Sequence, residues 1–218
     1  ESTRPGHESV TAEEELDRLM PALEAMVSRV NLPVSVDTSK AVVAQTAVAA
    51  GAAIINDQWG LKSEPEIAIV AAQTGAGLIL MHNQKGRHYN DLIPDISSSL
   101  SASAKTALDA GVPKGNIIFD PGSGFGKTPD HNLEILNRLR EFTSLGYPLL
   151  LGTSRKSTIG MVLDLAVEER VEGTAATVAL AIAAGVDIVR VHDVRHMVRV
   201  CRMSDAVVRG WRPSGWKR

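Results

Sequence analysis

The sequence predicts an α/β protein built on a parallel sheet, and three observations support this fold class. Short apolar runs rich in Val, Ile and Leu alternate with longer stretches that have helical periodicity. The apolar runs lack polar alternation, as expected of strands that crossover helices cover on both faces. No repeat, linker or low-complexity tract interrupts this order, so we expect residues 1–218 to form a single domain.

Six apolar runs have the length and composition of buried strands. In chain order they are Val34–Val36, Ala53–Ile55, Leu78–Met81, Ile117–Phe119, Leu149–Leu151 and Ile188–Val191.

Helical stretches lie between these runs. The first begins with Thr11 and has Glu14 three residues later, which is the capping-box pattern, while Pro21 should kink or interrupt it. The later stretches are Lys40–Ala50, Glu66–Gln73, Ile96–Ala110, Leu133–Leu145 and Val171–Ala184. Several are followed by a glycine that can serve as a C-cap, namely Gly51, Gly111 or Gly185.

Composition excludes several classes of protein. The chain has 23 basic and 25 acidic residues without a long like-charge run, so nothing favours nucleic acid or a membrane as partner. Its single cysteine, Cys201, excludes an intrachain disulfide framework. There is no apolar run long enough to span a bilayer and no signal-peptide pattern, so we expect a cytoplasmic location.

Reactive side chains follow nearly every expected strand. They are Asp37, Asn56 and Asp57, His82, Asp120, Ser154 to Lys156, and Arg190 with His192. An open sheet gathers its ligand-binding residues near one switch point, whereas a barrel collects them from many strand ends. This distribution favours a TIM (β/α)8 barrel.

Two carboxylates stand where strands leave the sheet. Asp37 and Asp120 could bind adjacent N–H groups of a flat heterocycle, or act as acid and base. Capping of the next helix is the alternative for each. Because Asn56 and Asp57 occupy a third strand end, a polar ligand is favoured.

The glycine-rich segment Asp120–Thr128 ends in Gly-Lys-Thr but is not a Walker A loop. That motif needs a glycine six residues before Lys127, where this chain has Pro121. A flexible loop beside Phe125 suits close approach to a planar ligand, and a plain turn is the alternative.

Cationic groups occur at two further strand ends. Thr153–Ser157 opens a helix with hydroxyl and cationic side chains, which suits an anion or an electron-rich ring. Arg190 and His192 should point to the same side of a strand because side chains alternate. If these two and Arg4 converge, they form a clamp for phosphate.

The sequence offers little support for a metalloenzyme or a hydrolase. Its six histidines contain no HExxH pair, so we expect no tightly held protein-ligated metal. No GxSxG elbow is present either.

Several segments together resemble the dihydropteroate synthase family in order and spacing across the whole chain. They are Glu1–Gly6, Val36–Lys40, Ile55–Asp57, Met81-His82, Asp120–Thr128, Ser154–Ser157 and Arg190–Val194. The resemblance implies a transferase that condenses 6-hydroxymethyl-7,8-dihydropterin pyrophosphate with p-aminobenzoate in folate synthesis, releasing pyrophosphate.

The resemblance also implies roles for single residues. The catalytic candidates are Asp37, Asp120 and Lys156, which with Asn56 would hold the pterin. Further substrate-binding candidates are Met81, Phe125 and Gly152; Arg4, Arg190 and His192 for pyrophosphate; Pro5 and Ser157 around p-aminobenzoate, where sulfonamides compete; and Thr3 in the pterin or p-aminobenzoate region. Mg²⁺ would bridge the pyrophosphate, and a homodimer would form through the last helices, which carry Met197, Val198 and Val207.

Two features depart from the family. Its usual first strand, Asn-bearing loop, helix and second strand do not precede Glu1, so we expect these residues alone not to close an eight-stranded barrel. Gln58-Trp59 stands where the family usually has smaller residues.

Two other functions remain open on sequence alone. Pterin-binding methyltransferase domains share the barrel and an Asp and Asn-Asp pattern, but do not typically carry the Ser154–Ser157 and Arg190–Val194 segments together. A non-catalytic paralogue that binds pterin or a protein partner is the second alternative.

Overall fold

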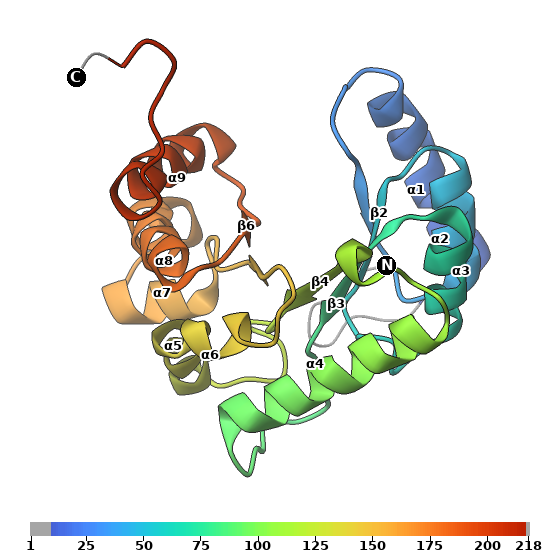
Figure 1. The fold of residues 1–218 in the computed structure, drawn as a ribbon, viewed down its shortest axis with the longest axis horizontal. Coiled ribbons are helices and arrows are strands. Elements are labelled where there is room, and N and C mark those ends of the chain that lie inside the picture. The colour runs from blue at the N-terminus through green and yellow to red at the C-terminus, as the bar shows by residue number, and fades with distance from the viewer. Residues whose placement is uncertain (1–9, 217–218) are drawn as a thin grey trace. The chain divides into compact units, whose positions relative to one another are not determined.

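The computed structural model describes residues 10–216, which fall into two compact units (Figure 1). The first unit contains residues 10–84 and 96–119, and the second contains 85–95 and 120–216. Thr3, Arg4 and Pro5, three of the predicted site residues, lie outside the described residues.

The first unit is built on a sheet whose strands follow one another in chain order. These strands are β1 (Ser35–Asp37), β2 (Ile54–Asp57), β3 (Gly77–Met81) and β4 (Ile117–Asp120). β1 pairs in parallel with β2, and β2 with β3, in the register Val36 to Ile55 to Leu78. All four strands were predicted, and each lies within about two residues of its expected position.

Helices α1 (Ala12–Val27), α2 (Ala41–Ala49) and α3 (Glu66–Thr74) pack one against the next beside this sheet (Figure 1). Leu23 of α1 joins Val34, Val36 and Ala47 in one buried apolar cluster. The chain also forms α4 (Leu92–Asp109) and a short 3-10 helix at Lys114–Asn116. Helices thus pack against the parallel strands, as the apolar composition of these strands predicted.

The start of α1 was predicted correctly, but Pro21 does not interrupt it. The Thr11 hydroxyl accepts a hydrogen bond from the Glu14 N–H at 3.2 Å, as a capping residue should. Pro21 cannot donate to the carbonyl of Asp17, and both residues are exposed, so water can satisfy that carbonyl. The helix therefore continues to Val27.

In the second unit, β5 (Leu150–Leu151) and β6 (Ile188–Val189) pair in parallel. The helices are α5 (Pro129–Asn137), α6 (Leu139–Thr143), α7 (Ser157–Leu163), α8 (Val171–Ala184) and α9 (Val194–Val208), with a 3-10 helix at Val167–Glu169. α8 packs against each of the other four helices (Figure 1). Val178, Ile182 and Met197 form the buried contact between α8 and α9.

The predicted helix Leu133–Leu145 is two helices with an earlier start. Thr128 caps α5 by accepting from the His131 N–H at 3.1 Å, and Pro129 occupies the first turn. The chain leaves helical geometry at Arg138, whose guanidinium binds Glu134 and Glu141 on either side. Thr128-Pro129 is a typical helix start, whereas the predicted start at Leu133 followed from apolar periodicity alone.

Glycines after three helices adopt the left-handed backbone that a C-cap requires. Gly51, Gly111 and Gly185 have φ values of 107°, 97° and 104°. These values confirm the predicted helix ends. No helix in the part of the chain that the structure describes is long and apolar enough to cross a membrane.

Candidate active site

The ends of β1 and β2 bring together two residues that the sequence predicted, and one that it did not assign to the site. Asp37 and Asn56 are opposite one another in the parallel register, and the Asn56 Nδ2 donates to Asp37 Oδ1 at 2.7 Å. Gln58 Nε2 donates to the other carboxylate oxygen, also at 2.7 Å. Asn56 and Gln58 are buried, whereas Asp37 is exposed.

Asp57 shapes the turn that follows β2. Its carboxylate is fully buried and accepts the backbone N–H groups of Trp59 at 2.9 Å and Leu61 at 2.6 Å. Burial raises the pKa of Asp57, while these backbone donors oppose the rise. Asp57 is therefore a structural residue of this turn.

The end of β3 adds three buried side chains to the first unit. Met81 is 1% exposed, and His82 and Asn83 are also buried. The Lys62 ammonium donates to the Asn83 carbonyl at 2.7 Å, and burial lowers the pKa of Lys62. Met81, a predicted substrate-binding residue, is therefore packed inside the first unit at the end of β3.

Asp120 is the centre of the polar cluster in the second unit. It is 1% exposed, and its Oδ1 accepts the Gly122 N–H at 2.8 Å. Its Oδ2 accepts from Arg190 Nη2 at 2.9 Å. The sequence predicted both side chains for the site, but not their pairing.

Gly152 lies behind the Arg190 side chain. A Cβ added at Gly152 would lie 3.4 Å from Arg190 Nε and Nη2, in contact with the guanidinium. β6 ends at Val189, so Arg190 and His192 lie beyond the strand. The prediction that strand alternation points both side chains to the same side therefore does not apply. Arg190 instead reaches Asp120, while His192 turns to Ser154, whose hydroxyl lies 2.9 Å from His192 Nδ1.

Lys156 lies over the glycine-rich loop. Its ammonium donates to the Ser123 carbonyl and stands 4.9 Å from the centre of the Phe125 ring. Burial lowers the pKa of Lys156 to about 8, with Asp120 raising it and Arg190 lowering it further. Asp120, Lys156 and Arg190 thus interact electrostatically within one unit.

The loop before α7 is fixed by a bidentate ion pair. Arg155 has a left-handed φ of 56° and binds both oxygens of Asp193, at 2.9 and 2.5 Å. Hydrogen bonding to Arg155 lowers the pKa of Asp193. This pair fixes the backbone next to Lys156 and next to His192. Ser157, which is exposed, begins α7.

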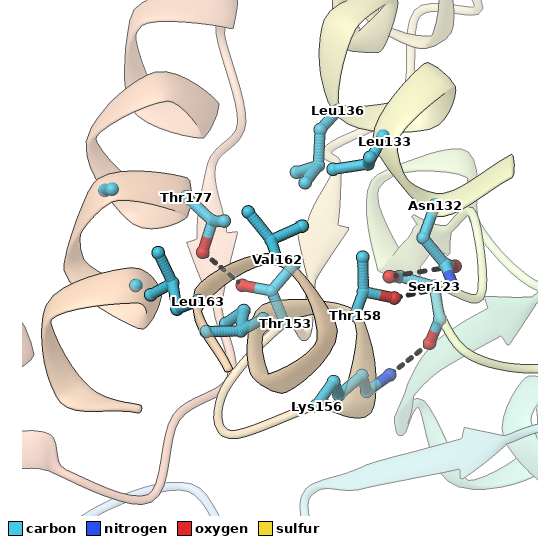
Figure 2. A pocket seen from close by; sticks show the side chains of 13 residues that line it. Ser123, Asn132, Leu133, Leu136, Thr153, Lys156, Thr158, Val162, Leu163 and Thr177 are labelled. Carbon is cyan, nitrogen blue, oxygen red and sulfur yellow. Dashed lines mark hydrogen bonds between the residues drawn. The ribbon is translucent and has the colours of Figure 1, made fainter. Parts of the chain in front are cut away.

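Asn132 is a positioning residue that the sequence did not reveal (Figure 2). Its Oδ1 accepts the Gly124 N–H at 2.7 Å, and its Nδ2 donates to the Thr158 hydroxyl at 3.1 Å. It therefore ties the glycine-rich loop to α7. A buried asparagine in an otherwise amphipathic helix was the only signal of this role.

An apolar cavity of about 170 Å³ lies beside this network, between α5, α7 and α8 (Figure 2). Leu133, Leu136, Val162 and Leu163 supply its walls. Figure 2 shows the Lys156 ammonium directed toward Ser123. Among the residues from 10 to 216, no three His, Cys, Asp or Glu side chains cluster as metal ligands would.

Comparison with known proteins gives one consistent family. Residues 1–192 match the family described as pterin binding enzyme. The chain is 54% identical over 208 residues to the dihydropteroate synthase of Bacillus subtilis, covering 95% of this chain and 73% of that protein. Clostridium beijerinckii has a dihydropteroate synthase that is 50% identical, with 96% and 78% covered.

A solved structure agrees with these sequences. Dihydropteroate synthase from Clostridium difficile, solved in the presence of pteroic acid, superposes with a TM-score of 0.93 at 46% identity, covering 96% of this chain and 80% of that chain. The fold, the family match and the sequence identities all point to one conclusion. The chain belongs to the dihydropteroate synthase family of pterin-binding enzymes.

Proposed function

We propose that the chain condenses 6-hydroxymethyl-7,8-dihydropterin pyrophosphate with p-aminobenzoate, using the Asp120 cluster to bind the pterin. This reaction is the activity of the family, and it yields 7,8-dihydropteroate and pyrophosphate. The observation that carries the proposal is the buried Asp120 carboxylate with Lys156 and Arg190 as its charged neighbours. Buried charges of this kind are typical of functional sites.

Asp120 is suited to the aminopyrimidine edge of a pterin. Within residues 10–216, each of its oxygens accepts one hydrogen bond, from Gly122 or Arg190, and each keeps a further lone pair. Two adjacent N–H groups of the ring can therefore bind the carboxylate side by side. Lys156 would face the O4 and N5 side of the ring, and Phe125 would pack nearby.

Arg190 and His192 would stabilise the departing pyrophosphate. The C–O bond of the substrate breaks as negative charge develops on the bridging oxygen, and preorganised cations lower the barrier to that step. The Arg190 side chain is 38% exposed, so a ligand can reach it. Arg4 would complete the clamp.

The electron-rich pterin stabilises the methylene cation that remains. The p-aminobenzoate nitrogen, which is neutral at pH 7, then forms the new C–N bond and loses a proton to solvent. Such an amine needs placement more than a strong base. Ser157 and Pro5 would border this substrate, and Thr3 would assist in the pterin or p-aminobenzoate region. The family resemblance also assigns substrate-binding roles to Asp37, Asn56, Met81 and Gly152.

We infer that Mg²⁺ enters with the pyrophosphate. Mg²⁺ prefers phosphate oxygens and retained waters to a cage of protein side chains, and when bound it would neutralise phosphate charge. We also propose a TIM (β/α)8 barrel that these residues do not close by themselves, a homodimer and a cytoplasmic location, in keeping with the family.

Calorimetry tests the function directly. Dihydropterin pyrophosphate with Mg²⁺ is titrated into the full-length protein and into its Asp120→Asn variant, and p-aminobenzoate is then added to detect pyrophosphate release. We expect binding and release in the wild type, and binding weakened at least about tenfold in the variant, because one ring N–H would face an amide NH₂.

Asp109→Asn is the matched control, since this exposed aspartate on α4 pairs only with Lys105 among the described residues. It should bind as the wild type does. Binding without pyrophosphate release would instead identify a non-catalytic paralogue, and absence of binding in the wild type would overturn the pterin assignment.

A further inference from the structure

Gln58 holds one half of the Asp37 carboxylate. Asn56 belongs to β2, Gln58 is the first residue after that strand, and both side chains reach Asp37. Each donates its amide NH₂ to a different oxygen of Asp37, at 2.7 Å in both cases. The carboxylate is thereby fixed in position and in rotation.

The turn after β2 keeps Gln58 in this place. Asp57 accepts two backbone N–H groups from the residues that follow Gln58, and the Asp57 carbonyl accepts the Gly60 N–H at 3.2 Å. Leu61 has a left-handed φ of 63° within the same turn. Gln58 is 6% exposed, so its side chain has little freedom to leave Asp37.

The arrangement is costly for stability. An ionised carboxylate can only accept hydrogen bonds, so both amide NH₂ groups must face Asp37 and both amide oxygens must turn away. Asn56 Oδ1 and Gln58 Oε1 are buried, and neither has a hydrogen-bond partner among residues 10–216. Buried acceptors without donors destabilise a fold, so these two oxygens offset stability that the hydrogen bonds to Asp37 contribute.

We propose that Gln58 is a positioning residue that fixes the Asp37 carboxylate for the N–H groups of a bound reduced pterin. Asp37 itself is exposed, so its remaining lone pairs can accept from a ligand while the two amides hold it from behind. The inference rests on the proposed function, because it takes Asp37 as a pterin ligand. Gln58 acts through Asp37 and needs no contact with the substrate.

The Gln58→Met variant separates positioning from a structural role. Methionine has a similar length and no hydrogen-bonding amide, so it removes both the donor to Asp37 and the unpaired oxygen. We expect the KM for dihydropterin pyrophosphate to rise about tenfold with kcat nearly unchanged. We expect the Tm of the ligand-free protein to rise by about 2–4 °C.

The same substitution at Gln73, an exposed residue of α3, is the matched control. Gln73→Met should change neither KM nor Tm. If Gln58→Met lowers both the affinity and the Tm, Gln58 is merely structural, and the proposal is wrong.

Gln58→Glu adds a pH-dependent readout. It places a second carboxylate against Asp37, and like charges so close repel unless the pair holds a proton. A shared proton would restore an O–H···O hydrogen bond in place of the amide. We therefore expect the KM ratio of variant to wild type to fall as the pH is lowered from about 8 to about 5.5.

The proposed function and the role of Gln58 can be overturned separately. If the wild type does not bind dihydropterin pyrophosphate, the proposed function fails and this inference fails with it. If the wild type binds and Gln58→Met leaves KM unchanged, the function stands and only the role of Gln58 is overturned.

Discussion

Burial changes the pKa of one residue of the proposed site, Lys156. Its four-carbon stem crosses the glycine-rich loop, and a Cβ added at Gly124 would lie 3.2 Å from that stem. Desolvation lowers the pKa of Lys156 from 10.5 to about 8, so the ammonium is still protonated at neutral pH but loses its proton just above it. Substrate binding that needs this charge must weaken in the same range.

We expect the affinity of the wild type for dihydropterin pyrophosphate to fall about tenfold per pH unit above about 8. Lys156→Gln should bind more weakly at pH 7 and show no such fall, because no proton is lost there. Calorimetry between about pH 7 and about pH 9 measures both. A wild-type affinity that stays constant over this range would contradict the assigned role.

The same shift can be measured without substrate. Between the folded-state pKa of about 8 and the unfolded-state value near 10.5, the unfolded chain binds the additional proton. The contribution of Lys156 to the free energy of unfolding therefore increases as pH rises through this window. Denaturant titrations should show a smaller increase for Lys156→Gln than for the wild type.

At the scale of elements, close packing of α7 on its neighbours supports the Lys156 loop. Arg170 precedes α8, donates to the Arg155 carbonyl at 3.0 Å, and binds the Leu165 carbonyl through two more nitrogens. A Cβ added at Gly160 of α7 would overlap the Arg170 guanidinium. A methyl group at position 160 would therefore displace the Arg170 guanidinium from these hydrogen bonds.

Gly160→Ala should destabilise the protein by about 1–3 kcal/mol, because the added methyl displaces Arg170 and with it the loop at Arg155. Thermal unfolding should show a Tm lower by several degrees, and pterin binding should weaken as well. Gly115→Ala is the control, since a Cβ at Gly115 meets no atom within 4 Å. Equal Tm values for the two variants would exclude this packing argument.

At the scale of the whole molecule, the proposed homodimer cannot use one of the three apolar residues that the sequence suggested for it. Met197, one of the three apolar residues expected there, is 1% exposed and packs inside the unit against α8. Val198 and Val207 of α9 remain 40% and 73% exposed. An interface through α9 must therefore be formed by its outer face.

We expect light scattering to give twice the chain mass for the full-length wild type. Val207→Glu should move the dimer–monomer transition to higher protein concentration, because it places a charge in an apolar contact. Val30→Glu, an equivalent change at an exposed valine of the other unit, should not do so. A wild type that is monomeric at all concentrations would refute the dimer.

Local sequence patterns were enough to predict the order of the elements and the residue types at the strand ends. All six strands appear where apolar runs predicted them, and the helix Val171–Ala184 has the predicted bounds. These features depend on neighbours within a few residues, such as the Thr11 cap or the glycine after a helix. The sequence could also identify Asp37, Asn56, Asp120 and Lys156 as site candidates, because each lies near the end of a predicted strand.

Which of these side chains contact one another depends on how each unit folds. Asp120 and Arg190 are 70 residues apart in the chain, and their ion pair follows from how the unit folds. The lowered pKa of Lys156, the Asn132 tie and the Gln58 contact with Asp37 likewise depend on burial and on long-range packing. Local patterns contain no information on such contacts, because desolvation and hydrogen bonding act through space.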